Sequence, residues 1–306
     1  MVFKIESIVS SVSLGDMVLM DQVHSGKVVV VIPLHKVTYT NYEQISLLQS
    51  VRTLSDFDIC MLVPSSLLSN DDFLHEMKRL GVLNGKAYFQ AFEDHYFESL
   101  RGYNRLMLEA EFYRRFLSFE YILIVQPDVF VFSGDLLGFL NDGFDYMGAP
   151  WFAGRSRATA TSPMLGFAGN GGLSLRKVAS FLHVLENGSR RVEKIQDVFP
   201  LLGETMWWRK PFRLYKELER FFLYNRVDHF WMHPHFEDFF WAYYVPKMYP
   251  EFNVALPEYA MRFSFEYNPS RLYEMNGNKL PFGCHAWWKT DLSFWKKHIS
   301  LYGYDV

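Results

Sequence analysis

The chain has 306 residues, of which 49% are hydrophobic and 21% charged, and this composition excludes an intrinsically disordered protein and supplies a large core. The formal net charge of −3 provides no basic field, so we expect no nucleic-acid partner. The aromatic share of 18% is typical of a Phe-rich core, and it also suits stacking on flat bases or sugar rings.

The N-terminal segment does not have the pattern of a signal peptide. Glu6 and Asp16 fall where a signal peptide would have to stay apolar, so we expect no signal peptide, and no apolar run approaches the ~18 residues that cross a bilayer. Two cysteines, Cys60 and Cys284, are too few for a disulfide framework. We expect a cytoplasmic protein. The basic and aromatic segment 207–213 is either a peripheral contact with the inner face of the plasma membrane or a solvated loop with packed aromatics.

The first half of the chain alternates between buried strands and helices. Apolar and β-branched runs predict strands at 28–34, 58–63, 86–89 and 121–125. Apolar stripes and an Asn/Asp start predict helices at 42–54, 70–80 and 104–119. This alternation is typical of an α/β fold with a mostly parallel central sheet flanked by helices.

The second half is less regular. Segment 153–172 is rich in Gly, Ala, Ser and Thr and predicts a mobile loop, whereas 200–236 is aromatic and basic without a strand period. No internal repeat and no low-complexity linker separates this half from the first. We therefore expect a single domain over residues 1–306.

Ligands of such a sheet bind at the carboxyl ends of its strands, where Pro33, His35, Gln126 and Asp128 follow two of the predicted strands. Neither a G-x-G-x-x-G motif nor a P-loop is present, which weakens dinucleotide and P-loop interpretations. Asp128 lies between apolar strand segments, where a carboxylate is costly to bury unless a partner such as Mg²⁺ or Mn²⁺ neutralises it. The alternative is an ordinary aspartate that caps a turn.

Three later segments also carry candidate chemistry. The Gly-rich segment 169–172 permits close approach of the backbone to a ligand, or forms an ordinary hairpin turn. Glu237 and Asp238 open an aromatic helix, where they either cap that helix or supply a general base whose pKa is raised by an apolar pocket. His285 lies in a turn near the chain end and is either a metal ligand or a structural histidine.

Seven segments, in order, resemble the bacterial DUF5672 family and, more broadly, GT-A-type glycosyltransferases. They are VVVVIPL (28–34), GYNRLML (102–108), YILIVQPDVFVF (121–132), DYMGAPWF (145–152), GNGGLSLR (169–176), EDFFWAYYVP (237–246) and LPFGCHAWWK (280–289). The resemblance covers roughly residues 28–295. It implies a GT-A-like, mostly parallel central sheet with a C-terminal, acceptor-side elaboration.

The resemblance also implies an activity. Residues 1–150 would bind a UDP-, dTDP- or GDP-linked sugar, and residues 151–306 would bind a glycan or lipid-linked acceptor whose hydroxyl receives that sugar with inversion, in surface polysaccharide or glycoconjugate synthesis. Mn²⁺ or Mg²⁺ would be held by Asp128, the last position of a D-x-D motif, and by His285. Gln126 replaces the first acid of that motif and would bond a ribose hydroxyl without charge.

Individual residues receive roles from the same resemblance. Asp238 would be the catalytic base, with Glu237 as an orienting or substrate-binding group. The nucleoside of the donor would contact Pro33, His35, Tyr103 and Asn104. The loop that shapes the sugar and acceptor pocket would consist of Gly169, Asn170, Gly171 and Gly172.

Three other functions stay open from the sequence. A nucleotidyltransferase shares the nucleotide-binding sheet and the carboxylate site, although PLHK after the first strand is unlike its usual Gly-rich loop. A metal-dependent hydrolase would use His233, His235 and Asp238 together. An inactive sugar-binding relative is the third alternative, because Gln126 departs from D-x-D.

Overall fold

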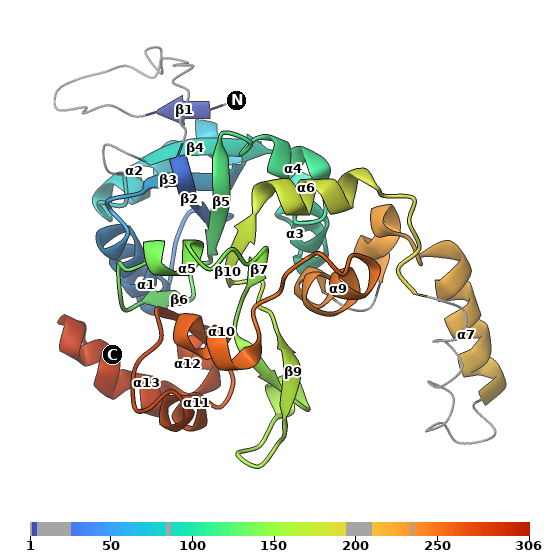
Figure 1. Cartoon of the computed structure of the whole chain (residues 1–306). Coiled ribbons are helices and arrows are strands. Elements are labelled where there is room, and N and C mark those ends of the chain that lie inside the picture. Colours follow the sequence, from blue (N-terminus) through green and yellow to red (C-terminus); the bar gives the residue numbers. More distant parts are fainter. Residues whose placement is uncertain (1, 5–25, 84–86, 194–209, 234–235) are drawn as a thin grey trace.

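A seven-stranded sheet forms the centre of the structure, a computed structural model that describes residues 2–4, 26–83, 87–193, 210–233 and 236–306 (Figure 1). Its order is β1-β4-β3-β2-β5-β10-β7. The strands are β1 (Val2–Lys4), β4 (Ala87–Phe92), β3 (Asp58–Pro64), β2 (Gly26–Pro33), β5 (Phe119–Val125), β10 (Leu173–Lys177) and β7 (Tyr146–Met147). The four strands from β4 to β5 are parallel, whereas β1, β10 and β7 each pair antiparallel to a neighbour. The expected α/β fold with a mostly parallel central sheet is confirmed.

The central strands form because their apolar runs are buried on both faces. Strand β2 has no exposed surface at Val29, Val30, Val31 and Ile32. The same holds for Ile122, Leu123 and Ile124 in the neighbouring strand β5. Alternate residues point to opposite faces, so one sheet supplies two separate cores. This explains why a continuous hydrophobic run, and not an alternating one, marks these strands.

Helices cover both faces of the sheet. One face packs against α1 (Asn41–Thr53), α2 (Asp71–Arg79) and α10 (Pro257–Phe263). The other face packs against α3 (Leu100–Leu106), α4 (Ala110–Arg114), α6 (Val178–Glu186) and α9 (Val245–Met248). Helix α1 begins with a capping box in which Thr40 and Glu43 bond each other's backbone, and Asn70 caps α2 through the amide of Phe73.

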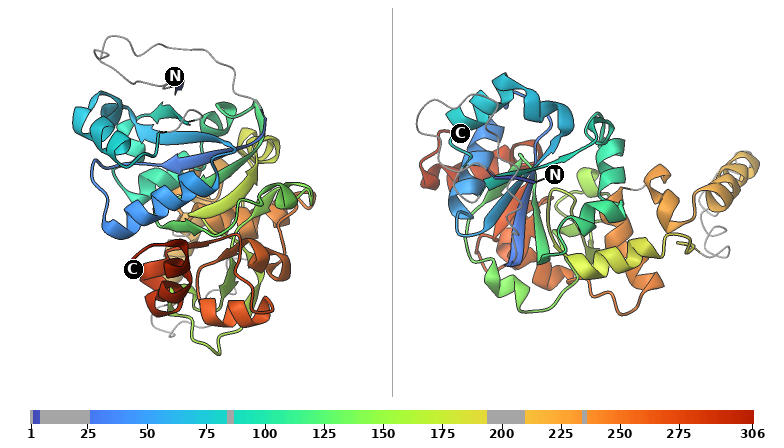
Figure 2. Two further views of the ribbon diagram at one scale, coloured as in Figure 1. Left: turned by 90° about the vertical axis from the view of Figure 1, so that its left-hand side faces the viewer. Right: turned by 90° about the horizontal axis from the view of Figure 1, so that it is seen from above.

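A second layer of structure lies beyond the carboxyl ends of β2 and β5. A small sheet has the order β11-β12-β6, from β11 (Ser264–Phe265), β12 (Gly283–His285) and β6 (Val129–Val131), and β8 (Pro150–Phe152) pairs with β9 (Met164–Ala168). The C-terminal helices pack against this sheet, as the left view of Figure 2 shows. They are α11 (Pro269–Met275), α12 (Trp287–Thr290) and α13 (Leu292–Ile299).

Helices α5 and α7 differ in their surroundings. Helix α5 (Leu137–Leu140) is a single turn after β6. Helix α7 (Lys210–Leu223) projects away from the rest of the chain in both Figure 1 and Figure 2. No helix within the described residues has the length and apolar character needed to cross a bilayer.

Two expectations about local structure were wrong. The single helix predicted at 104–119 is divided into α3 and α4, and β5 already begins at Phe119. Leu106, Met107 and Leu108 are consecutive and all buried, and one helix face cannot bury three successive residues together with Phe112 and Tyr113. Segment 153–172 is likewise not one loop, because β9 occupies Met164–Ala168 and pairs with β8.

Candidate functional site

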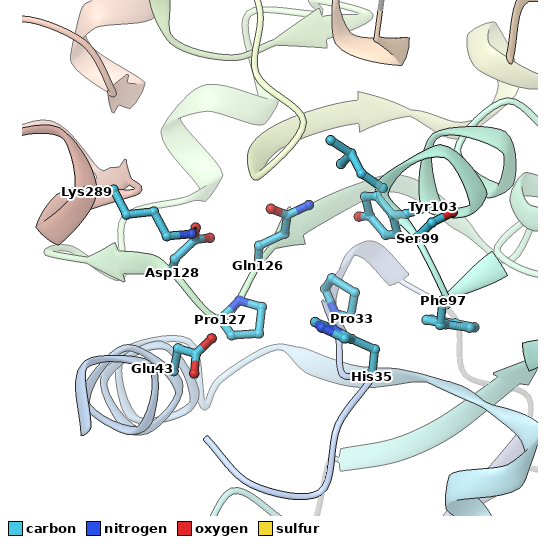
Figure 3. Close-up of a pocket in the computed structure, with 11 residues that line it drawn as sticks. Pro33, His35, Glu43, Phe97, Ser99, Tyr103, Gln126, Pro127, Asp128 and Lys289 are labelled. Atoms are coloured by element: carbon cyan, nitrogen blue, oxygen red, sulfur yellow. Dashed lines mark hydrogen bonds and ion pairs between the residues drawn. The ribbon is translucent and has the colours of Figure 1, made fainter. Parts of the chain in front are cut away.

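A pocket of about 280 Å³ opens at the carboxyl ends of β2 and β5, and we refer to it as the first pocket (Figure 3). Five residues that the sequence analysis singled out line it together: Pro33, His35, Tyr103, Gln126 and Asp128. They come from the end of β2, from α3 and from the turn after β5, which are far apart in the sequence. The fold therefore brings these strand ends together around one cavity.

The remaining lining residues of the first pocket were missed by the sequence analysis. They are Glu43, Phe97, Ser99, Leu100, Pro127 and Lys289. Lys289 is the last residue of the segment LPFGCHAWWK (280–289), so its proximity to His285 in the sequence was an available signal. Glu43 lies inside an ordinary amphipathic helix and binds Lys36, so nothing in its local pattern marks it.

Asp128 stands at one edge of the first pocket and is neutralised by two cations. Its Oδ1 lies 3.2 Å from Nε2 of His285, and its Oδ2 accepts a hydrogen bond from Nζ of Lys289 at 2.7 Å. Burial raises the pKa of Asp128, but His285 and Lys289 outweigh it and hold that pKa well below its usual range. The carboxylate is therefore ionised, and two positive groups flank it.

His285 is held between two carboxylates. Its Nδ1 lies 3.2 Å from Oε1 of Glu266, a residue that the sequence analysis did not identify. Burial lowers the pKa of His285, but Asp128 and Glu266 outweigh it and raise that pKa to about 10. Glu266 follows β11, which pairs in parallel with β12, so only the sheet register places it beside His285.

The Gly-rich segment 169–172 lies against this cluster. Asn170 is buried, and its Oδ1 accepts hydrogen bonds from the amides of Gly172 and Leu173, while its Nδ2 donates to Oε2 of Glu266 at 2.9 Å. Both polar atoms of the Asn170 side chain thus have protein partners. The arrangement makes Asn170 a residue that positions Glu266 and, through it, the ring of His285.

The glycines of this segment permit close contact with other parts of the site. A Cβ on Gly172 would collide with the ring of His285, and a Cβ on Gly171 would lie 2.9 Å from Oε1 of Glu237. A Cβ on Gly169 would lie 2.8 Å from the methyl group of Ala242. Each position therefore requires glycine because a protein group already occupies the space, and none of these glycines lines the first pocket.

Glu237 is buried deep behind the segment 169–172. It is 2% exposed, and its Oε1 accepts a hydrogen bond at 2.9 Å from Nη2 of Arg176, which has no exposed surface. Its backbone amide donates to Oδ1 of Asn104 at 2.8 Å, so Asn104 supports Glu237 and does not line the first pocket. Burial raises the pKa of Glu237, and Arg176 opposes that shift. Arg176 in β10 was not singled out by the sequence analysis.

Asp238 is half-buried beside Glu237 at the start of α8 (Glu237–Phe239). The helix continues through a π-helical segment, Phe240–Tyr244, into α9. Burial and the adjacent Glu237 raise the pKa of Asp238 to about 7, while Arg155 and the amide of Phe239 oppose the shift. A carboxyl group that titrates near neutral pH can both hold and release a proton under ordinary conditions, which is the property that a general base needs.

The site of the hydrolase alternative, His233, His235 and Asp238, can be placed only in part. His233 is buried and stacks on Phe230 with ring centroids 4.5 Å apart, and His235 lies outside the described residues. Throughout the part of the chain that the structure describes, no group of three or more His, Cys, Asp and Glu side chains is arranged to hold a metal ion. Trp207, Trp208 and Arg209 of the predicted membrane contact also lie outside the described residues.

Several solved structures are similar to this chain. The mannosyltransferase Ktr4p from S. cerevisiae, in complex with GDP, is 15% identical with a TM-score of 0.30, and the match covers 41% of this chain and only 41% of that one. A glycosyltransferase involved in glycosylation of the major capsid of PBCV-1 is 12% identical over 90% of this chain and 100% of that chain, with a TM-score of 0.39. Mouse xyloside xylosyltransferase 1 is 9% identical over 85% and 97%, with a TM-score of 0.45.

None of the curated proteins matches the chain in sequence. A family model described as a protein of unknown function, DUF5672, matches residues 86–285, which is more than half of the chain. This range contains six of the seven segments on which the resemblance was based, in whole or in large part. The chain therefore belongs to the DUF5672 family.

Proposed function

We propose that this chain is a glycosyltransferase that moves a sugar from a nucleotide-linked donor to a hydroxyl group of a glycan or lipid-linked acceptor. The observation that carries the proposal is the convergence of Pro33, His35, Tyr103, Gln126 and Asp128 on one pocket at the carboxyl ends of β2 and β5. These strand ends are where parallel sheets bind nucleotides. The family resemblance supplies the reaction class, and surface polysaccharide or glycoconjugate synthesis is the setting that it favours.

In this proposal the first pocket takes the nucleotide. Burial and the neighbouring Lys36 lower the pKa of His35, so its imidazole is neutral at pH 7 and offers a flat, uncharged face to a base. Gln126 presents an amide to a ribose hydroxyl. Lys289 lines the first pocket beside Asp128, where a diphosphate would lie, and it belongs to the predicted acceptor half, 151–306. The two predicted halves would thus share the donor.

The residues present fit a divalent cation with two protein ligands. Oδ1 of Asp128 and Nε2 of His285 converge to 3.2 Å, and Glu266 binds the opposite ring nitrogen, as carboxylates do for metal-bound histidines. Mg²⁺ or Mn²⁺ is commonly held by one or two protein groups with the substrate phosphates completing its shell. When bound here, such a cation would supply positive charge to the diphosphate of the donor.

Asp238 serves as the base in this proposal. Its pKa of about 7 allows it to accept the proton of an acceptor hydroxyl as that oxygen attacks the anomeric carbon. A single displacement of this kind inverts the anomeric configuration. Oε1 of Glu237 accepts a hydrogen bond from Arg176, so we assign Glu237 to positioning α8 beside the base.

The experiment is a screen of UDP-, dTDP- and GDP-linked sugars by thermal unfolding, with and without Mn²⁺ or Mg²⁺, followed by a transfer assay with the sugar that binds. A ligand that binds only the native state raises its apparent stability. Asp128→Asn should lose the metal-dependent part of the shift, and His285→Ala should lose less. Exposed Asp305→Asn is the matched control.

The outcomes separate the alternatives. Unchanged donor binding in Asp128→Asn, or full activity in EDTA, would contradict the assigned metal site. Donor binding without any transfer would favour the inactive sugar-binding relative. Release of pyrophosphate from a nucleoside triphosphate when a sugar 1-phosphate is supplied would indicate a nucleotidyltransferase.

We also infer that α7 contacts an anionic lipid surface where a lipid-linked acceptor is held. Phe212, Tyr215 and Phe222 are 68%, 61% and 65% exposed on this projecting helix, whose sequence begins KPFRLYK. Exposed aromatics interleaved with basic residues are typical of interfacial helices. In a sedimentation assay with phosphatidylglycerol vesicles, the wild type should pellet with the vesicles, whereas the double variant Phe212→Ser/Phe222→Ser should stay in the supernatant. Equal fractions of the two proteins in the vesicle pellet would contradict this contact.

A further inference from the structure

A second pocket, of about 350 Å³, lies on the other side of Lys289 from the first pocket. Lys289 lines both, so the two pockets meet at the Asp128–Lys289 ion pair. The lining of the second pocket includes Arg155, Glu266, Tyr267, Asn268 and Asp291. The second pocket thus adjoins the cluster of Asp128, His285 and Glu266, because Glu266 lines it and binds His285.

Arg155 is held in an unusual way. Its backbone has φ of 50°, in the left-handed region that non-glycine residues rarely adopt and that often marks functional sites. Its guanidinium lies 4.4 Å from the ring centroid of Trp151 and 4.8 Å from that of Phe239. Two aromatic faces therefore fix the plane of the guanidinium in place without using its N–H groups.

The Nη2 atom of Arg155 is buried and has no hydrogen-bond partner among the residues that the structure describes. A buried charged donor without a partner is costly, and such groups in native proteins ordinarily find an acceptor. A guanidinium held between two rings, with a buried and unused N–H donor at Nη2, is suited to a carboxylate or a phosphate, whose oxygens match its fork.

The other charges around the second pocket already have partners. Lys289 binds Asp128 at 2.7 Å, and Glu266 lies 3.2 Å from His285. Asp291 caps α13 by accepting from the amide of Phe294 at 3.0 Å. Within the described lining, Arg155 is therefore the cation that keeps a buried donor without a partner, and an anion is the ligand whose oxygens that donor would bind.

The position of Arg155 also relates the second pocket to the base. The ring of Phe239 on which Arg155 stacks belongs to the residue directly after Asp238. Arg155 is one of the groups that act electrostatically on Asp238. A molecule that pairs with Arg155 would thus lie beside the group assigned to deprotonate the acceptor.

We propose that the second pocket binds an acceptor sugar that carries an anionic substituent, a carboxylate or a phosphate, through the guanidinium of Arg155. The proposal rests on the proposed function, because it names the acceptor class of that reaction. Arg155 would set acceptor specificity and would orient the attacking hydroxyl toward Asp238. A neutral sugar would leave the guanidinium unpaired and would bind more weakly.

Isothermal titration tests the proposal without requiring turnover. The probes are methyl glucuronide, glucose 6-phosphate and the neutral methyl glucoside, added to the purified full chain in the presence of UDP, dTDP or GDP. At least one anionic probe should bind about 10- to 100-fold more tightly than methyl glucoside, as a charged hydrogen bond provides. The preference of glucuronide over phosphate, or the reverse, identifies which anion is used.

Arg155→Gln should remove this preference while leaving the affinity for methyl glucoside unchanged. Arg157→Gln is the matched control, since Arg157 is an exposed arginine two residues away that does not line the second pocket. Both variants are first checked by thermal unfolding. Arg155→Lys, which keeps the charge without the planar fork, should retain part of the preference and covers the case in which Arg155→Gln does not fold.

Three results would overturn the proposal: equal binding of all three sugars by the wild type, a preference that survives in Arg155→Gln, or a preference that is also lost in Arg157→Gln. A further titration compares the binding of UDP-glucuronate with that of UDP-glucose, in the wild type and in Arg155→Gln. If Arg155→Gln weakens only the binding of UDP-glucuronate, the anion belongs to the donor sugar and the acceptor assignment is wrong. Binding of an anionic sugar without any glycosyl transfer would contradict the proposed function alone.

Discussion

Single residues of the site are governed by how their buried charges are paired. Asp128, His285 and Glu266 form a chain in which one imidazolium lies between two carboxylates, whereas Asp238 has Glu237 beside it, opposed by Arg155 and by the amide of Phe239. The pairing of Asp128 with His285 stabilises the ionised form of both groups. The surroundings of Asp238 instead keep its pKa close to neutral pH. The two kinds of pairing give the two groups of residues different chemistry.

The first prediction concerns Asp238. Its pKa of about 7 lies above the ordinary 3.8, so the base is available above pH 7 and kcat/KM should fall as the pH drops below about 7. Asp238→Asn should lower kcat by ~10²–10⁴-fold and leave the affinity for the donor largely unchanged. Steady-state kinetics across pH 5–9 and NMR of the anomeric product provide the measurement.

Glu237→Gln is the control for Asp238. Since Glu237 neutralises buried Arg176, this change should mainly lower stability. A larger loss of kcat in folded Glu237→Gln than in Asp238→Asn would show that Glu237, and not Asp238, is the base. A retained anomeric centre in the product would contradict the inverting mechanism itself.

The second prediction concerns the pH dependence of stability that His285 confers. Its pKa in the folded protein, about 10, lies above the ordinary 6.5, so the protonated form is favoured by folding. The resulting stabilisation is complete below pH 6.5 and is lost as the pH rises toward 10. Urea unfolding in EDTA should show a smaller decline over this range for Asp128→Asn than for the wild type, by more than about 1 kcal/mol. Parallel declines would show that the ion pair does not contribute.

At the level of elements, the turn between β9 and β10 is where three separate parts of the site meet. Gly172 faces β12, Gly171 faces α8, and Asn170 reaches Glu266 after β11. Strand β10 then carries Arg176 under α8. A short turn and one strand thus fix the relative positions of the histidine, the two acids of α8 and the acid after β11.

The third prediction tests this packing with glycine variants. The new methyl group of Gly172→Ala would collide with the ring of His285, so the ring must move away from Asp128. We expect a loss of donor binding of at least ~10-fold, measured by titration, with a smaller loss of stability of about 1–3 kcal/mol. Gly166→Ala is the control, because no other group lies within 4 Å of the place that its new methyl group would take. If Gly166→Ala weakened donor binding as much as Gly172→Ala does, the contact between Gly172 and the ring of His285 would not be the cause.

The fourth prediction concerns the buried ion pair that joins β10 to α8. Arg176→Met leaves the carboxylate of Glu237 buried without its cation, and we expect a loss of about 3–5 kcal/mol in the free energy of unfolding. Arg176→Met/Glu237→Met removes both charges and should recover most of that loss. Urea unfolding of the three proteins measures the coupling, and a double variant less stable than Arg176→Met would show that the pair is not the cause.

Across the whole molecule, the first pocket lies between the parallel strands and the C-terminal layer. Pro33 and Gln126 belong to the main sheet and the turn that follows it, whereas Lys289 belongs to α12 beyond the small sheet. Because β6 follows β5 directly and pairs with β12, the small sheet connects the two layers covalently and by hydrogen bonds. A ligand in the first pocket therefore contacts both layers.

The fifth prediction concerns a nucleotide bound in the first pocket, where it would contact both layers. A nucleotide at 100 times its dissociation constant should stabilise the native state by about 2.7 kcal/mol. Differential scanning fluorimetry with UDP, dTDP and GDP should reveal the one that binds, and Gln126→Ala should reduce its effect. Gln126→Asp should retain binding. An unchanged affinity in Gln126→Ala would contradict the ribose contact.

The sequence by itself determined the central strands and most helices of the first half, because continuous apolar runs and capping residues act locally. It also singled out Asp128, Tyr103 and Gln126, which line the first pocket, and His285, which contacts Asp128, since their motifs are contiguous.

Only the tertiary structure showed that Glu266, Lys289, Arg176 and Arg155 belong with them, and that the predicted helix 104–119 is divided. Each of these depends on contacts between segments far apart in the chain. Glu266 reaches His285 through the register of β11 with β12, and Arg176 reaches Glu237 across 61 residues. A charge that is neutralised by a distant partner leaves no periodicity or spacing in its own segment, so its role is decided only when folding brings the two together.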